Sequence, residues 1–184
     1  NEDNYSAGEI TKLAEIIELA IGMWKYTPER DVKAEFVKAL IRSNKSLAYA
    51  LKDEMELPAE NIMSVFYYKG VETSKCNSII SDFEMKENAE VIRLAEGSES
   101  YGVIIKKGDA PSDEVFTGKA AVLGMYEKLK EDNKALRVFH VTGINGIEGA
   151  ADAFHLIVET WTFVESVFPY KRVFTKYELS LASN

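Results

Sequence analysis

Cysteine is nearly absent from this sequence, and its scarcity limits the kinds of protein the chain can be. Cys76 is the single cysteine among 184 residues, so no disulfide can form within the chain. With one cysteine and two histidines, a zinc site of the Cys/His type is not expected. Such low cysteine usage is typical of a reducing compartment, with the cytoplasm as first candidate. An assembled particle is the alternative location. Because the sequence begins at Asn1 and not with methionine, a removed leader peptide also stays open.

Long apolar runs and clusters of basic residues are also missing. The longest apolar stretch, IIELAIGMW, contains Glu18 and is too short to cross a bilayer. Lysine and arginine total 22 against 30 aspartate and glutamate residues, which gives a formal net charge of −8. This acidic balance argues against a general affinity for nucleic-acid backbones or anionic lipid. We therefore expect neither nucleic acid nor a membrane as the partner.

The N-terminal third has the apolar periodicity of a helix that buries one face. Apolar residues recur there at steps of three and four: Ile10, Leu13, Ile17, Ala20, Ile21 and Trp24. Ser6 and Glu9 stand in the S-x-x-E relation of a capping box, which predicts where this helix begins. Thr27-Pro28 predicts the start of a second helical segment, which Ser43-Asn44 can break and Pro58 ends.

The rest of the chain is richer in strand patterns. Short β-branched or aromatic runs predict an antiparallel meander through 61–70, 78–85, 89–95 and 100–107. The first of these runs, NIMSVFYYKG, is apolar on both faces, which is typical of a strand covered on two sides. Beyond it the patterns predict a helix over 119–130, a strand over 136–141, a helix over 150–168 and a closing strand over 171–181.

Together these patterns predict an α+β fold in a single domain over residues 1–184. The N-terminal part, 1–57, is expected to be helical. The α+β core, 58–184, is expected to hold an antiparallel or mixed sheet meander, followed by an α-β-α-β part that packs on the same sheet. We therefore expect helices first and one sheet that organises everything after them.

The glycines at 143, 146 and 149 form the most conspicuous motif, within HVTGINGIEGAADAFH. A loop of this kind, between a strand and a helix, can aim backbone N–H groups at an anion, so Gly143, Asn145, Gly146 and Gly149 are candidate cofactor-binding residues. However, Asn145 replaces the second glycine of the dinucleotide fingerprint, and Glu148 already offers negative charge to the helix. The sequence therefore favours a tight turn in which glycine supplies positive φ.

The two histidines are the candidate catalytic residues, together with Glu159. His140 lies near a strand end, where ligand sites are common, but a hydrogen-bonded core histidine is the favoured interpretation. His155 is flanked on its helix by Asp152 and Glu159, a set that could bind a metal or relay a proton. A solvated helix face is favoured there. Cys76, in the polar stretch VETSKCNS, is interpreted as an ordinary surface or half-buried thiol.

No catalytic constellation is complete in the sequence, and we expect no cofactor. The favoured hypothesis is a non-enzymatic interaction or assembly component, an oligomeric structural protein such as part of a viral or secretion-type assembly. Its partner would be protein, with self-association through an edge strand at the chain's end or through the N-terminal helices. One alternative is a small-molecule or nucleotide-binding enzyme that uses the Gly143–Gly149 loop with His140 and His155. Another is an acidic inhibitor or immunity-type protein that blocks a basic partner.

Overall fold

The computed structural model describes residues 7–25, 30–58, 62–107 and 118–183. The chain divides into two compact units, residues 1–31 and 32–184. The first unit contains helix α1 (Ala7–Lys25), which confirms the first predicted helix. Ser6, Thr27 and Pro28, on which two predicted helix starts depend, lie outside the described residues. Among the described residues, no helix is both long enough and apolar enough to cross a membrane.

The second unit begins with two short helices, α2 (Val32–Ile41) and α3 (Lys45–Glu54). Ser43 separates them with a φ of +54°, and Asn44 caps α3 by accepting a hydrogen bond from the backbone N–H of Leu47 at 3.3 Å. Both features fit residues that favour turns and helix N-termini over helix interiors. The break predicted at Ser43-Asn44 is confirmed.

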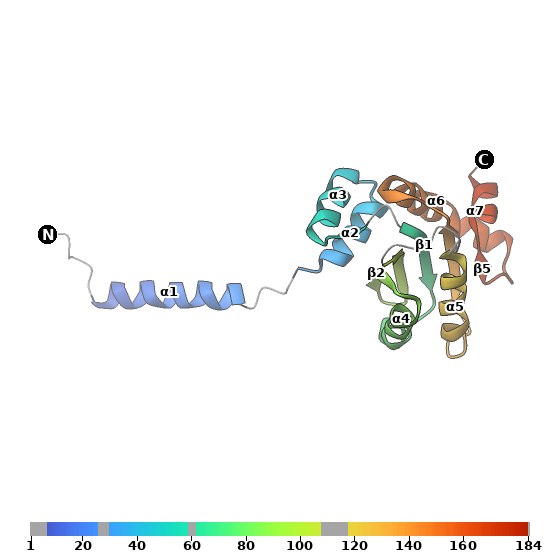
Figure 1. Ribbon diagram of the computed structural model, residues 1–184. Coiled ribbons are helices and arrows are strands. Elements are labelled where there is room, and N and C mark those ends of the chain that lie inside the picture. The colour runs from blue at the N-terminus through green and yellow to red at the C-terminus, as the bar shows by residue number, and fades with distance from the viewer. Residues whose placement is uncertain (1–6, 26–29, 59–61, 108–117, 184) are drawn as a thin grey trace. The chain divides into compact units, whose positions relative to one another are not determined.

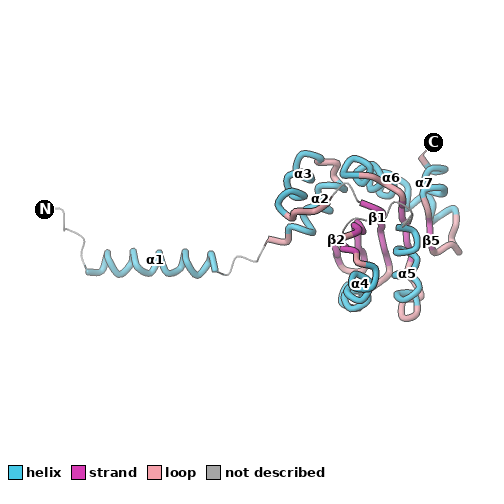
Figure 2. The backbone as a smooth tube through the Cα atoms, viewed as in Figure 1, coloured by secondary structure: helices cyan, strands magenta, loops and turns pink. Residues whose placement is uncertain are grey.

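A five-stranded mixed sheet forms the centre of the second unit, in the order β2-β3-β1-β4-β5 (Figures 1 and 2). Its strands are β1 (Ile62–Lys69), β2 (Ala89–Glu96), β3 (Glu99–Lys106), β4 (Arg137–Thr142) and β5 (Val173–Phe174). β1 pairs antiparallel with both β3 and β4, and β2 pairs antiparallel with β3. β5 is parallel to β4, which makes the sheet mixed.

The connections between the strands are helical. α4 (Thr73–Glu87) follows β1, and α5 (Gly118–Lys130) precedes β4. The series β1-α4-β2-β3-α5-β4 with this strand order is the ferredoxin-like arrangement of two split β-α-β units. α6 (Gly146–Val167) then leads to β5, and α7 (Lys176–Ala182) is the last element. The predicted α+β fold, with N-terminal helices before the sheet and helix–strand alternation after it, is confirmed.

Both faces of the sheet are covered, and each face has its own apolar core. One core joins α2, α3 and α6 to strand residues such as Val65, Tyr67 and Phe139. The other joins α4 and α5 to Phe66, Tyr68 and other strand residues. Figure 1 shows α2 and α6 above the strands and α4 and α5 below or beside them. This coverage is the physical reason why β1 is apolar on both faces, as the sequence predicted.

The predicted strand over 78–85 is wrong, because this segment belongs to helix α4. Cys76, Ile80 and Phe83 are buried in the core beneath the helix at spacings of four and three, which is a helical period. The short apolar pair Ile79-Ile80 within a polar stretch resembles a strand when read by itself. Cys76 is accordingly buried in α4 and does not lie in a surface loop.

The predicted closing strand over 171–181 is also wrong. Only Val173–Phe174 pair with β4, and α7 follows immediately. Thr175 caps α7, since its hydroxyl accepts from the backbone N–H of Tyr177 while the Glu178 carboxylate accepts from the backbone N–H of Thr175 at 2.8 Å. The described chain therefore ends in a helix, and the edge strand expected at its end is absent there.

Candidate functional site

A shallow cavity of about 200 Å³ lies at the C-terminal end of β4. Its lining residues come from three elements: Lys119 from the start of α5, His140 and Thr142 from β4, and Thr175, Lys176 and Tyr177 from the cap and first turn of α7. The parallel pairing of β5 with β4 explains this meeting. Phe174 lies opposite Phe139, so the residues after β5 are carried to the end of β4.

His140 is the buried member of this cavity lining. The residue is 2% exposed, and neither ring nitrogen has a hydrogen-bond partner among the described residues. Burial and, to a smaller extent, the nearby Lys119 ammonium lower the pKa of His140 to about 4. The imidazole is therefore neutral at neutral pH. The burial fits the core histidine that the sequence favoured, but the expected hydrogen bond is not made within the described chain.

The charged groups of the cavity are cations. Lys119 and Lys176 have no ion-pair partner among the described residues, although the chain as a whole is acidic. The nearest carboxylate in sequence, Glu178, is already occupied: it is paired with Lys171 and accepts from the Thr175 hydroxyl at 2.6 Å. No carboxylate is among the six lining residues. The cavity therefore combines two ammonium groups, neither in an ion pair with a described residue, with a neutral imidazole and threonine hydroxyls.

The glycine loop does not line this cavity. Gly143 and Gly146 both have a φ of +70°, as a tight connection between β4 and α6 requires. Asn145 is the N-cap of α6, without a capping hydrogen bond from its side chain, and Gly149 lies within the helix. The cavity beside His140 is instead completed from α5 and α7. The three glycines are therefore not among the residues that line the cavity beside His140, although Gly143 directly follows the lining residue Thr142.

The second histidine lies on an exposed face of α6. His155 Nε2 is 3.1 Å from Glu159 Oε1, and both side chains are more than half exposed. Asp152 on the same helix is also exposed. Within the described part of the chain, no group of three or more histidine, cysteine or acidic residues is placed to hold a metal ion. This arrangement matches the solvated helix face that the sequence favoured.

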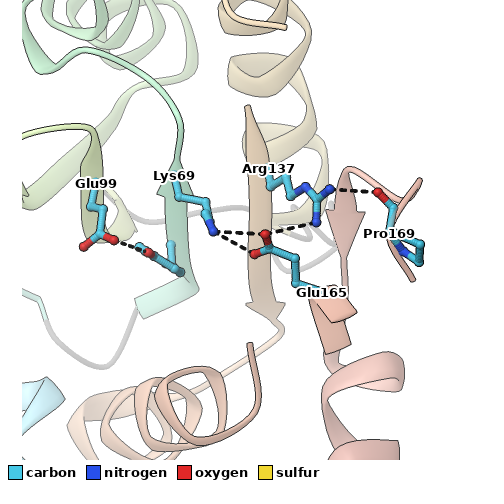
Figure 3. Close-up of polar contacts among 6 residues, drawn as sticks. Lys69, Glu99, Arg137, Glu165 and Pro169 are labelled. Carbon is cyan, nitrogen blue, oxygen red and sulfur yellow. Dashed lines mark hydrogen bonds and ion pairs between the residues drawn. The ribbon is translucent and has the colours of Figure 1, made fainter. Parts of the chain in front are cut away.

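A polar cluster on the other side of the sheet was not anticipated from the sequence. Glu165 on α6 is 2.8 Å from Lys69 Nζ on β1 and 3.2 Å from Arg137 on β4 (Figure 3). Arg137 also donates to the carbonyl of Pro169 at 2.8 Å, and Lys69 Nζ lies 4.4 Å from the centre of the Trp161 ring. Because Glu165 pairs with both cations, we interpret this cluster as a structural ion-pair network that holds α6 against the sheet.

The first unit presents a different kind of surface. Four large apolar side chains of α1 are half or more exposed: Ile10 at 59%, Leu13 at 59%, Ile16 at 63% and Ile17 at 50%. A cluster of exposed apolar side chains on one helix is typical of a protein-binding surface.

Three polar residues of the His140 cavity were not predicted from the sequence: Lys119, Thr142 and Lys176. No local motif marks them, since three separate elements bring them together.

Comparison with known proteins finds a similar fold and no family. No protein-family model matches the sequence, and no curated protein matches it. The fold is similar to the crystal structure of a regulator of polyketide synthase expression from Bifidobacterium adolescentis, with a TM-score of 0.56 and 12% sequence identity. The match covers 82% of this chain but 58% of that chain, so the present sequence spans little more than half of its neighbour's length. At this identity, the similarity shows a common fold alone.

Proposed function

We propose that this chain is an interaction component that self-associates, with α1 pairing with α1 of a second copy. The observation that carries the proposal is the exposed apolar stripe of α1, defined by Ile10, Leu13, Ile16 and Ile17. Most of the stability of a helix in a protein comes from packing its apolar face, so α1, a helix of 19 residues, gains stability when this stripe is covered. This gain favours a partner surface that covers the stripe.

The spacing of the stripe favours a second copy of the same helix as that partner. Ile10, Leu13 and Ile17 follow a three-four alternation, which Ala20 and Trp24 continue in the sequence. Isoleucine at the first and leucine at the fourth heptad position favour two-stranded coiled coils. The outer heptad positions carry polar residues: Thr11, Lys12, Glu15 and Glu18. The helix thus has an apolar seam that Ile16 and Ile21 widen on its two sides, with polar residues on the opposite face.

The structural neighbour supports a regulatory setting for this association. That neighbour is a regulator of polyketide synthase expression, and its fold is similar to that of the present chain over most of the chain's length. We therefore favour a regulatory interaction component. A viral or secretion-type assembly, which the sequence suggested by analogy of shape, gains no support from the comparisons.

The test is the molar mass of the full chain in solution, measured by size-exclusion chromatography with light scattering over a range of concentrations. We expect a concentration-dependent dimer. The double variant Leu13→Glu/Ile17→Glu should be monomeric, because it places two carboxylates in each half of the seam. The matched control, Thr11→Glu/Lys12→Gln, changes the net charge by the same amount on the outer positions and should keep the dimer.

Two results would contradict the proposal. A wild-type chain that stays monomeric at the highest concentration would show that α1 pairs with no second copy. Equal loss of the dimer in the seam variant and in its control would show that charge, and not the apolar seam, governs association. Circular dichroism of each variant checks that the second unit stays folded, so that loss of the dimer is not mistaken for loss of structure.

A further inference from the structure

We propose that the cavity between β4, α5 and α7 is a binding site for a phosphoryl group, carried by inorganic phosphate or by a small phosphomonoester. The residues that would hold the group are Lys119, His140, Thr142 and Lys176. The inference rests on the second unit alone and does not depend on how α1 associates. It follows from three properties of the cavity: an unsatisfied buried imidazole, an excess of positive charge, and a suitable size.

The unsatisfied imidazole indicates that a polar ligand is missing from the cavity. Burying a polar group without a hydrogen bond costs free energy, so native proteins rarely leave such a group unpaired. His140 is buried and lines the cavity, yet both of its ring nitrogens lack partners among the described residues. Ser64 is a second such group nearby: its hydroxyl is buried without a partner, and its register partner Thr142 also lines the cavity.

The charge of the cavity selects an anion. Lys119 and Lys176 supply two positive charges, and none of the described lining residues is acidic. Lys119 also lies in the first turn of α5, where a helix already presents the positive end of its dipole, and that turn itself contains no acidic residue. A cation at that place is unfavourable for the helix alone, which is consistent with a role in binding. The Thr142 hydroxyl can donate a hydrogen bond to an anionic oxygen. The neutral imidazole can do the same once its ring turns toward the cavity, since both ring nitrogens are buried as placed.

The size and number of donors favour a phosphoryl group over a carboxylate. A phosphoryl group is close to a dianion at neutral pH and offers three acceptor oxygens in a tetrahedral arrangement. Two ammonium groups, one imidazole and one hydroxyl match that number of acceptors and that charge. The cavity volume of about 200 Å³ leaves room for a small organic substituent beside the phosphoryl group. A carboxylate would neutralise one lysine and leave the other without a partner.

The two histidines of the chain make the test direct. The ring nitrogens of the ¹⁵N-labelled full chain are followed by NMR during titration with inorganic phosphate, at constant ionic strength maintained with sodium chloride. The variant His155→Gln assigns the two imidazoles. We expect saturable shifts of the His140 nitrogens and small, non-saturating shifts of the exposed His155 nitrogens. Parallel titrations with glycerol 2-phosphate and with acetate compare a phosphomonoester and a carboxylate with the free ion.

Lysine variants tie the binding to the cavity. Lys119→Met and Lys176→Met should each weaken phosphate binding by about tenfold or more, because each removes a charge-assisted contact. Lys134→Met removes one charge from an exposed position outside the cavity and should leave the affinity unchanged. Tighter binding of glycerol 2-phosphate than of phosphate would identify the ligand as a phosphomonoester, and the reverse order would identify it as the free ion.

Three outcomes would overturn the proposal. The first is the absence of any saturable shift at His140 with either phosphate compound while the chain remains folded. The second is binding of the same strength in Lys119→Met, Lys176→Met and the Lys134→Met control. The third is binding of acetate more tightly than of phosphate, which would assign the cavity to carboxylates. Failure of dimerisation through α1 would leave all three readouts unchanged, so the two proposals fail independently.

Discussion

At the scale of the residue, His140 shows how burial decides the chemistry of a side chain. The sequence marks His140 as a candidate because it lies near the end of a predicted strand, and the structure places it beside a cavity. Lys119 and Lys176 are the two cations that line the same cavity, and their place beside His140 is not predictable in this way. They belong to helices distant in sequence, and only the pairing of β5 with β4 brings the start of α7 to this cavity. Sequence reasoning therefore found the imidazole and missed the cations.

The pKa of His140 leads to a prediction about stability. The folded chain lowers this pKa from 6.5 to about 4, so the unfolded chain binds more protons between these values. The free energy of unfolding is therefore fully retained above pH 6.5 and falls as the pH decreases toward 4. The complete loss from this residue amounts to roughly 3 kcal/mol. We expect urea unfolding of the wild-type chain to show this decrease.

Two variants isolate the contribution of His140 from that of the carboxylates, which titrate in the same range. His140→Leu should remove the part of the pH dependence that lies between pH 4 and 6.5, so its unfolding free energy converges on, or exceeds, that of the wild type as the pH falls. His155→Gln removes an exposed histidine and should leave the wild-type slope intact. Parallel slopes for the wild type and His140→Leu would show that the imidazole does not remain neutral in the folded chain.

At the scale of the element, local patterns predicted most helices and strands and failed where tertiary structure or a cap decided the outcome. The sequence predicts a strand within α4 because the apolar residues of its buried face are few. Packing of these residues against α5 and the sheet stabilises the segment as a helix. α7 was read as a strand because its residues alternate between apolar and polar. The signal that could have identified it is local: Thr175 and Glu178 form a T-x-x-E capping box.

A close approach between strands leaves no room for a side chain at Gly102 of β3. A Cβ atom at Gly102 of β3 would lie 2.4 Å from Cζ of Phe66 and 2.8 Å from the carbonyl oxygen of Ile92. Phe66 is the register partner of Gly102 on β1, so its ring packs over the space that the glycine leaves. Gly102→Ala should therefore lower the free energy of unfolding by about 1–3 kcal/mol, as overpacked core substitutions do. Chemical denaturation measures this change.

The helical Gly124 provides the matched substitution. Nothing lies within 4 Å of a Cβ atom at Gly124 in α5. Gly124→Ala should therefore raise the free energy of unfolding by about 0.5–1 kcal/mol, since alanine loses less backbone entropy than glycine in a helix. The same chemical change thus has opposite signs at the two positions. If Gly102→Ala unfolded at the same urea concentration as the wild type, the packing of the Phe66 ring over Gly102 would be refuted.

At the scale of the whole molecule, the class of fold was predictable and the order of the strands was not. Strong periodicity identified the helices before the sheet and the α-β-α part after it, which is sufficient for an α+β assignment. Strand order depends on contacts between segments far apart in the chain. β1, the first strand, lies between β3 and β4, and no local pattern encodes that position. A second long-range pairing, of β5 with β4, brings together the residues of the His140 cavity, so no local pattern encodes that cavity either.

The division of the chain into two units predicts that the second unit folds without the first. Among the residues that the structure describes, every member of both apolar cores lies between Val32 and Ala182, within the second unit. Deletion of residues 1–31 should therefore leave a folded chain whose thermal midpoint differs from that of the full chain by no more than about 2–4 °C, which corresponds to roughly 1 kcal/mol.

Because the deletion removes α1, the shortened chain should be monomeric by light scattering and should keep the phosphate-dependent shifts of His140. A broad, non-cooperative transition after the deletion would mean that the second unit needs the first in order to fold. A dimer that persists without α1 would place the self-association elsewhere, with the edge strand β2 as the next candidate, since the antiparallel ladder ends there.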